Sequence, residues 1–239
     1  MSELISCEQI GDASHITLSR PENGNLISNP MAEDLIRMLK ASEKTSKLII
    51  FRGAGRDFCV GREGGRPPAD QKLTALEFRE YTTEPALRLY AAFRECKIPI
   101  IGVVQGRALG VGCSLAALCD MTLASDQSSY SFPEMTHDLP PTLAMSALLG
   151  KVSPKVISYM VYSTDEIDAA EAKDIGIISR VVAAQDLEVE VTRISEFMLG
   201  RTMPSLIAVK EYLRSAPSMD STAFSDFASN LLANVLASK

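Results

Sequence analysis

The sequence lacks several features that mark common functional classes. No stretch approaches eighteen unbroken apolar residues, so no membrane-spanning helix is expected. Lys and Arg form no block and the formal net charge is −6, which argues against nucleic acid or an anionic membrane as the main partner. The five cysteines include no CxxC pair and have no histidine at ligand spacing, so no metal site is expected.

The glycine-rich segments also lack the signatures of nucleotide-binding loops. After Gly110 and Gly112 no third glycine stands at position 115, so the dinucleotide-binding fingerprint is absent. No GK[ST] follows either, which excludes a P-loop, and the lack of GxSxG excludes a nucleophile elbow. We therefore expect neither a redox cofactor nor a metal cofactor.

The N-terminal ten residues contain no basic region followed by an apolar run, so no signal peptide is expected. An odd number of scattered cysteines fits a reducing compartment, and we expect a cytoplasmic protein. With 239 residues, of which 46% are apolar and 23% charged, the chain can form one large globular domain or one domain with an appendage.

Strand-like and helix-like segments alternate through the first three-quarters of the chain. The expected strands lie at 15–19, 47–51, 98–104 and 177–182, with another after Asp120. The expected helices begin at 29, 73, 140, 153, 167, 187, 203 and 221, and Pro85 should kink the one that runs from 73 to 96. The alternation predicts an α/β fold with parallel strands buried under helices.

Helices alone follow the last strand. We expect a core at 1–184 and a helical region at 185–239, which is too short for an independent domain and should pack on the core or on a neighbouring subunit. A glycine-rich loop at 58–65, extended by polar and breaker residues to 70, is expected to be exposed.

The stretch from 98 to 134 organises the rest of the chain. An apolar strand leads into a glycine-rich turn around Val111 and then into a helix of small residues. Such a turn leaves backbone N–H groups unpaired and pointing outward, and these donors can bind an oxyanion. About twenty residues further on, Glu134 follows a proline that fixes its approach, which makes it a candidate general acid or base.

Each of these features alone has a plainer interpretation. Glycines at a strand-to-helix turn usually allow close packing, and a serine such as Ser114 near a helix start is usually a cap. A carboxylate such as Glu134 is most often solvated or in an ion pair. His137 and Asp138 follow Glu134 closely, and either could assist it.

The combination is more specific than its parts. FCVGRE at 58–63, GRALGVGCSLAALCD at 106–120 and FPE at 132–134 resemble the enoyl-CoA hydratase/isomerase (crotonase) superfamily. Arg20-Pro21 with Asn25-Leu26 is similar to the family's opening loop, and 167–182 is similar to its late helix–strand segment. The resemblance covers nearly the whole chain.

The resemblance implies a crotonase-like (ClpP/crotonase) spiral of ββα turns whose helical C-terminal region builds homotrimers, often paired into homohexamers. It implies an acyl-CoA thioester as substrate, with coenzyme A as part of that substrate and no separate cofactor. By position, the backbone N–H groups of Arg62 and Val111 would form the oxyanion hole. Five further residues would lie along the bound substrate: Asn25, Leu26, Gly61, Gly110 and Gly112.

The reaction itself is less constrained. Hydratases of this family carry two glutamates; here the second position is Glu134, the predicted acid/base, and the first is Ser114, predicted to position water or substrate. Hydration or isomerisation of an enoyl-CoA is the leading hypothesis. The Ser/Glu arrangement also resembles the hydroxycinnamoyl-CoA hydratase-lyases, and a thioester hydrolase or a non-catalytic CoA-binding relative are further alternatives.

Overall fold

The computed structural model describes residues 4–63 and 73–238. The predicted exposed loop at 58–70 therefore lies outside the described residues from position 64 onward. The main sheet has the strand order β1-β2-β3-β4-β6-β9, in which β1 and β2 are antiparallel and all other neighbours are parallel. Its strands are β1 (Ile5–Ile10), β2 (Ala13–Leu18), β3 (Leu48–Gly53), β4 (Ile100–Val104), β6 (Met121–Ser125) and β9 (Arg180–Val182).

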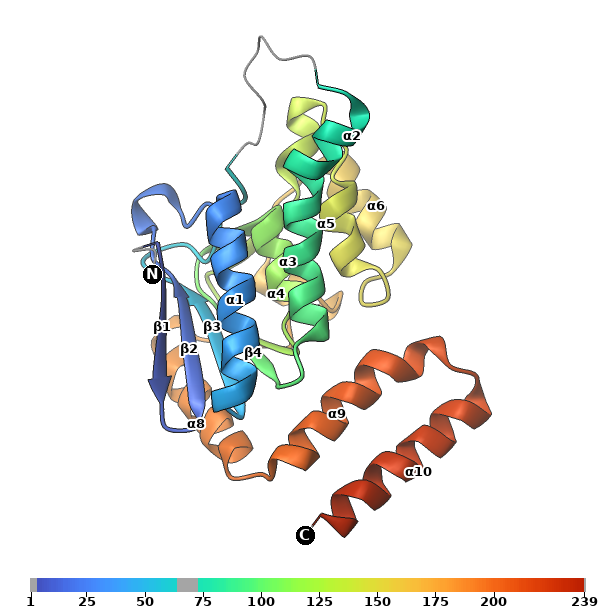
Figure 1. Ribbon diagram of the computed structural model, residues 1–239. Helices are drawn as coiled ribbons and strands as arrows, with labels where there is room; N and C mark the ends of the chain where they lie inside the picture. The colour runs from blue at the N-terminus through green and yellow to red at the C-terminus, as the bar shows by residue number, and fades with distance from the viewer. Residues whose placement is uncertain (1–3, 64–72, 239) are drawn as a thin grey trace.

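Helices cover both faces of this sheet, and the last two extend beyond it (Figure 1). The α-helices are α1 (Asn29–Thr45), α2 (Ala75–Phe78), α3 (Glu84–Glu95), α4 (Val111–Leu118), α5 (Thr142–Leu148), α6 (Pro154–Ser163), α7 (Ala169–Asp174), α8 (Leu187–Leu199), α9 (Met203–Ser215) and α10 (Ser221–Ala237). Shorter 3-10 turns lie at Pro21–Asn23, Pro133–His137, Ala184–Asp186 and Ala216–Ser218, and a π-helical turn at Arg79–Thr83.

Alternate residues of the central strands supply two separate hydrophobic clusters. In β3, Ile49 and Phe51 belong to the large cluster beneath α1, α3 and α4, where the ring of Phe51 meets that of Phe93 edge-on at 5.3 Å. Leu48 and Ile50 belong to the opposite cluster, which α8 covers. A parallel sheet buried on both faces requires such continuous apolar runs, and this explains the apolar strands of the sequence. The expected α/β architecture with a helical C-terminal region is observed.

A small second sheet lies beside the glycine-rich turn. Its order is β5-β7-β8, formed by β5 (Arg107–Leu109), β7 (Ser129–Ser131) and β8 (Ile167–Asp168). β5 and β7 are parallel, and they bring the turn at 110–111 next to the segment that leads to Glu134.

The structure departs from the expected elements in a few places. β1 and β5 were not expected, because their mixed polarity carries little pattern, and the strand expected after Asp120 is divided into β6 and β7. The segment from 167, expected to be helical, begins as β8, and Asp168 then caps α7 by accepting a hydrogen bond from the backbone N–H of Glu171 at 2.9 Å. α1 is capped by Ser28 rather than by Asn29.

The helix expected from 73 to 96 is divided rather than merely kinked. Its α-helical pattern opens into the π-helical turn Arg79–Thr83, and α3 begins with Pro85 in its first turn. Proline has no N–H to donate, so the carbonyl of Tyr81, four residues earlier, receives no hydrogen bond from position 85. The side-chain amide of Asn29 donates to that carbonyl at 3.2 Å.

The C-terminal helices differ in how they are held. α8 packs against the sheet through Leu187 and Val191. α9 is held at Lys210, which is 7% exposed and donates to the carbonyl of Ile98 at 2.9 Å and to Asp120 at 2.7 Å. α10 buries no residue and runs beside α9 (Figure 1).

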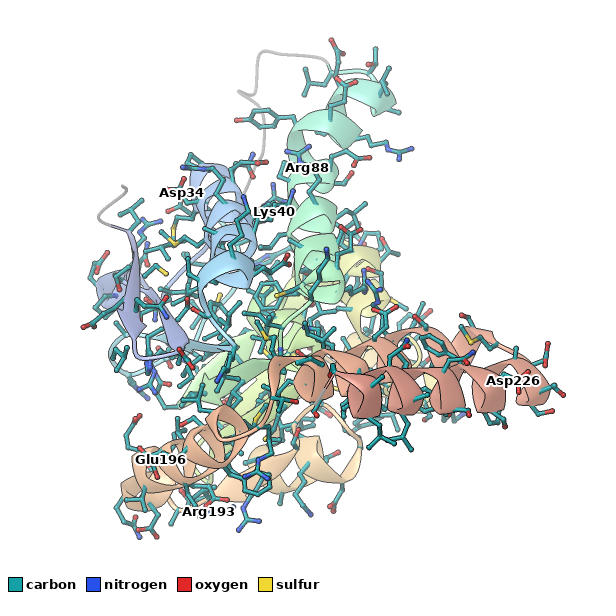
Figure 2. All side chains as sticks on the ribbon, turned by 60° about the horizontal axis from the view of Figure 1, so that its bottom comes forward. Asp34, Lys40, Arg88, Arg193, Glu196 and Asp226 are labelled. Carbon is teal, nitrogen blue, oxygen red and sulfur yellow. The ribbon has the colours of Figure 1, made fainter. Side chains whose placement is uncertain are left out.

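Charged side chains lie at the periphery of the helices. Figure 2 shows Arg193 and Glu196 on the outer side of α8 and Asp226 on α10. Among the described residues, no helix is long and apolar enough to cross a bilayer.

Candidate active site

The candidate site lies where two loops after the central strands are tied together. The carboxylate of Asp57 accepts hydrogen bonds from the backbone N–H of Arg107 at 3.1 Å and from its guanidinium at 3.0 and 2.8 Å. These bonds from Arg107 are the main reason that the pKa of Asp57 lies below its ordinary value. Charge-assisted bidentate pairs of this kind fix geometry strongly, so the segments around 57 and 107 form one unit.

Backbone contacts continue this pairing toward the glycine-rich turn. The N–H of Leu109 donates to the carbonyl of Cys59 at 2.9 Å. A Cβ on Gly112 would lie 1.9 Å from that same carbonyl oxygen, so no larger residue fits there without a shift of the backbone. Gly112 is therefore explained by close approach of the two segments.

The backbone N–H of Arg62 faces away from its neighbouring segment. Ile27 bridges it in parallel fashion, donating to the carbonyl of Gly61 at 3.1 Å and accepting from the N–H of Glu63 at 3.0 Å. Arg62 lies between these two bonded residues, so its own N–H points away from Ile27. The N–H of Arg62 donates to no described residue.

The side chain of Arg62 anchors this position from the other side. Its guanidinium donates to the carbonyl of Thr82 in the π-helical turn and to the side chain of Asn29 at 2.6 Å. Burial lowers the pKa of Arg62 below its ordinary value. The opened turn before Pro85 thus provides a hydrogen-bond acceptor for Arg62, which ties the strand-like segment at 62 to α1 and to the start of α3.

The second unpaired backbone donor is at Val111. Gly110 adopts φ 51° and ψ −113°, a conformation open essentially to glycine alone, and Val111 then begins α4. The unusual backbone angle therefore falls on Gly110, and the β-branched side chain of Val111 is not strained. Among the described residues, the N–H of Val111, like that of Arg62, has no hydrogen-bond acceptor.

Glu134 lies directly against Gly110. A Cβ at Gly110 would be 2.7 Å from Glu134 Oε1, so glycine is needed there for the carboxyl group to fit. Oε2 of Glu134 is buried and makes no hydrogen bond within residues 4–63 and 73–238. Burial raises the pKa of Glu134 above its ordinary value, and a hydrogen bond from its own backbone N–H partly opposes the shift. The two residues suggested as helpers, His137 and Asp138, are exposed.

Ser114 is fully buried, but its hydroxyl is already engaged. It donates to the carbonyl of Gly110, the residue just before α4, at 3.1 Å. The carbonyl of Ala144 is a second, longer acceptor at 3.5 Å. Its predicted role in positioning water or substrate stays a prediction.

The other predicted substrate contacts lie along the same loops. Asn25 is buried at φ 60°, and its amide bonds the backbone of Arg20, Ala54 and Asp57 at 2.8 to 2.9 Å. Its polar side-chain atoms therefore hold the opening loop in place. Leu26 is half-buried, with Cδ2 3.7 Å from where a Cβ of Gly61 would lie. Their contacts with a substrate stay predictions.

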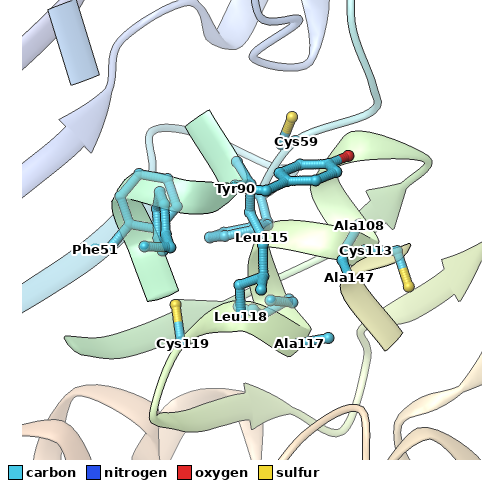
Figure 3. Close-up of a cluster of buried hydrophobic side chains, with 14 of the residues drawn as sticks. Phe51, Cys59, Tyr90, Ala108, Cys113, Leu115, Ala117, Leu118, Cys119 and Ala147 are labelled. Atoms are coloured by element: carbon cyan, nitrogen blue, oxygen red, sulfur yellow. The ribbon is translucent and has the colours of Figure 1, made fainter. Parts of the chain in front are cut away.

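One polar group at the site was not identified from the sequence. Tyr90 of α3 is fully buried, and its hydroxyl makes no hydrogen bond with the part of the chain that the structure describes. In Figure 3 the hydroxyl points to the side of the cluster on which Cys59, Ala108 and Cys113 lie. The only sequence signal was a tyrosine in place of an apolar residue on a buried helix face, which is commonly a core position.

The buried cysteines do not act as nucleophiles in this environment. Burial raises the pKa of Cys59 to about 12 and that of Cys113 above its ordinary value, and only a thiolate is strongly nucleophilic. Within the described residues, no three His, Cys, Asp or Glu side chains are grouped to hold a metal ion.

Residues 11–239 match the family model described as "Enoyl-CoA hydratase/isomerase". The chain belongs to the enoyl-CoA hydratase/isomerase (crotonase) family. It is 32% identical over 228 residues to the rat "Enoyl-CoA hydratase domain-containing protein 3, mitochondrial", covering 92% of this chain and 74% of the relative. It is 30% identical over 220 residues to the Escherichia coli "2,3-dehydroadipyl-CoA hydratase", covering 90% and 83%.

Solved structures of crotonase-family proteins have the same fold. The human enoyl Coenzyme A hydratase domain-containing protein 3 matches with a TM-score of 0.91 at 25% identity, covering 98% of this chain and 92% of the other. The enoyl-CoA hydratase of Mycobacterium smegmatis also reaches a TM-score of 0.91, at 20% identity, with 98% and 91% covered. The crotonase family acts on acyl-CoA thioesters, and this chain is a crotonase-family acyl-CoA enzyme. The predicted cytoplasmic location stays a prediction.

Proposed function

We propose that this crotonase hydrates or isomerises the double bond of an enoyl-CoA through a thioester enolate. The observation that carries the proposal is the contact between the Glu134 carboxyl group and Gly110, the residue that precedes the unpaired N–H of Val111. An acid/base group thus lies beside a candidate oxyanion donor. The relative in E. coli is named as a hydratase, which agrees with this chemistry.

The N–H groups of Arg62 and Val111 would bind the thioester oxygen as it gains negative charge. Such donors are worth about 3–4 kcal/mol each when they are fixed before the reaction. Both are held by features that the described residues supply: the side-chain anchors of Arg62 and the start of α4 at Val111. Because only backbone atoms are needed, the identity of either side chain does not limit this role.

Glu134 would move the proton. In hydration, water oxygen bonds to C3, the electron pair of the double bond moves onto the thioester oxygen, and Glu134 accepts one water proton. When the enolate collapses, Glu134 returns that proton to C2. In isomerisation the same carboxylate removes a proton from one carbon and returns it to another. The raised pKa of Glu134 suits both directions, since a group that both accepts and returns a proton works best when its pKa is near the working pH.

Three alternatives are based on the residue at position 114. Ser114 in place of a second glutamate, together with Glu134, supports a hydratase-lyase or a thioester hydrolase. Because Ser114 also leaves the site without a second carboxylate, the chain could instead be a CoA-binding relative without catalytic activity. We further propose that the chain forms a homotrimer or homohexamer. The reason is that α10 buries no residue within the chain and exposes Leu232 and Leu236. Light scattering would test the number of subunits.

The test is a mass-spectrometric screen against 2-enoyl, 3-enoyl and hydroxycinnamoyl CoA thioesters, with Glu134→Gln in parallel. A gain of one water identifies a hydratase, a retained mass with a new retention time identifies an isomerase, and fragmentation to an aldehyde and acetyl-CoA identifies a lyase. We expect Glu134→Gln to lose turnover by roughly 10²-fold or more while still binding CoA ligands. Equal turnover in the variant would remove Glu134 from the mechanism. Binding without turnover in the wild type would favour the non-catalytic relative.

A further inference from the structure

Two buried polar atoms of the site make no hydrogen bond to any residue that the structure describes. They are Oε2 of Glu134 and the hydroxyl oxygen of Tyr90. Leaving a buried polar atom without a partner costs about 1–3 kcal/mol, so two at one site need an explanation. Nothing in the folding of α3 requires a hydroxyl at position 90, because the ring alone fills the core.

The two atoms belong to one environment. Tyr90 is fully buried among residues of the site, and α3 packs on α4, the helix that starts at Val111. Burial raises the pKa of Tyr90, and the nearby Glu134 carboxylate and the thiols of Cys59 and Cys113 add to this rise. The neighbouring Ser114 hydroxyl opposes the shift, but it donates to the Gly110 carbonyl, and the two hydroxyls do not have the geometry of a hydrogen bond. The phenol therefore keeps its proton near neutral pH and acts as a donor.

The complementary chemistry of the two atoms defines what they can bind. Glu134 Oε2 is an acceptor that requires a donor, whereas the Tyr90 hydroxyl is a donor that requires an acceptor. The smallest group that meets both needs is a hydroxyl or a water, which donates one hydrogen bond and accepts another. A double bond or a saturated acyl chain meets neither.

We propose that Tyr90 is a substrate-contacting residue which, together with Glu134, binds the hydroxyl oxygen at C3: the water that adds and the alcohol that results. The inference rests on the proposed acyl-CoA function and selects hydration within it. Tyr90 would supply the second polar contact to the water that a second glutamate supplies in two-glutamate hydratases, with Ser114 holding the turn. Tyr90 keeps its own proton throughout, so the proton balance through Glu134 is unchanged.

The closing experiment compares binding of matched ligands that differ only in the hydroxyl. The probes are 3-hydroxybutyryl-CoA against butyryl-CoA and 3-hydroxydecanoyl-CoA against decanoyl-CoA, measured by calorimetry on the full chain. We expect Tyr90→Phe to weaken binding of the hydroxyacyl ligand about three- to tenfold and to leave the saturated ligand unchanged. In the same variant, hydration of a 2-enoyl-CoA should slow more than isomerisation of a 3-enoyl-CoA.

Tyr130→Phe is the matched control. Tyr130 is also fully buried, but its hydroxyl pairs with that of Ser128 at 3.1 Å. This variant should leave the ratio of the two affinities unchanged. Equal weakening of both ligands by Tyr90→Phe, or no change in either, would overturn the assignment. If the wild type binds no CoA thioester at all, the proposed function itself fails, and the role of Tyr90 falls with it.

Discussion

At the scale of single residues, the site is built from groups whose environment differs from their ordinary one. Glu134 is a half-buried carboxyl group against Gly110, and Tyr90 is a buried phenol with no partner. Unsatisfied polar atoms destabilise the folded chain, so their presence at one place is the expected cost of a site prepared for a ligand.

Substitution of Ser114 tests whether its hydroxyl has a structural or a catalytic role. Because its hydroxyl donates to the Gly110 carbonyl, Ser114→Ala removes one hydrogen bond within α4, and a net loss of about 0.5–1.5 kcal/mol in the free energy of unfolding is expected. Turnover should fall far less than in Glu134→Gln. Urea unfolding and steady-state kinetics measure the two effects. A loss of turnover comparable to that of Glu134→Gln would place the hydroxyl on the substrate.

The raised pKa of Glu134 also predicts how stability depends on pH. The folded chain holds the proton of Glu134 more tightly than the unfolded chain does, so unfolding releases a proton between the ordinary value of 4.5 and the raised pKa. Stability contributed by this group therefore falls as pH rises through that window and is lowest above it. Glu134→Gln removes the penalty, and its melting temperature should exceed that of the wild type at pH 8 but not at pH 4.

A carboxyl group with the opposite shift provides the control. The hydrogen bonds from Arg193 lower the pKa of Glu190, so the ionised form of Glu190 is favoured in the folded chain. Glu190→Gln should therefore give no gain in melting temperature at pH 8. A gain in both variants would show that amide substitution, rather than relief of burial, is responsible.

At the scale of elements, the positions of the candidate donors depend on two local departures from regular structure. Gly110 turns the chain at angles that other residues avoid, and Pro85 opens the helix before α3 so that Thr82 can accept from Arg62. Each departure was marked in the sequence by a glycine or a proline. The role of each departure depends on the segment packed against it: Glu134 lies against Gly110, and Arg62 donates to Thr82.

Gly112→Ala tests the close approach of the two loops. Inside a helix, alanine is favoured over glycine by about 1 kcal/mol, yet the new Cβ would lie 1.9 Å from the Cys59 carbonyl. We expect the clash to prevail and the free energy of unfolding to fall by about 2–3 kcal/mol in denaturant titrations. Gly200→Ala is the control, since its Cβ would meet nothing closer than 3.5 Å. Unchanged stability in Gly112→Ala would mean that the loops can separate at little cost.

At the scale of the whole molecule, the C-terminal helices are attached to different degrees. α8 is part of the packed body, α9 is fixed through Lys210, and α10 contacts mainly α9. The decreasing burial from α8 to α10 agrees with the proposal that other copies of the chain pack against the C-terminal helices.

Lys210→Met tests the attachment of α9. The change removes a buried ammonium from the carbonyl of Ile98 and from Asp120, whose carboxylate keeps its bond from the N–H of Ile100 at 2.7 Å. Hydrogen bonds to charged groups contribute about 1.5–3 kcal/mol, so amide exchange in α9 and α10 should accelerate roughly tenfold or more. Lys173→Met, which removes an exposed ion pair with Asp174, should leave exchange unchanged. Equal exchange rates in Lys210→Met and the wild type would show that other contacts hold α9.

Much of this molecule was determined by its sequence alone. The apolar runs at 48–51 and 100–104 specify buried parallel strands, because a sheet covered on both faces needs apolar residues at successive positions. The glycines around Val111 and the Phe-Pro-Glu step indicated the family and the candidate residues, because these motifs can be recognised within single segments of the sequence. The start of α8 at Leu187 was also predicted from the sequence.

Only the tertiary structure decided which groups at the site remain unpaired. Partners distant in sequence engage Asn25 and the side chain of Arg62. Among the described residues, the Tyr90 hydroxyl and Glu134 Oε2 are left without any partner. Hydrogen-bond satisfaction and burial are properties of what surrounds an atom in space. Local pattern therefore identified Glu134 as a candidate, but the unpaired phenol of Tyr90 emerged only when α3 was packed beside α4.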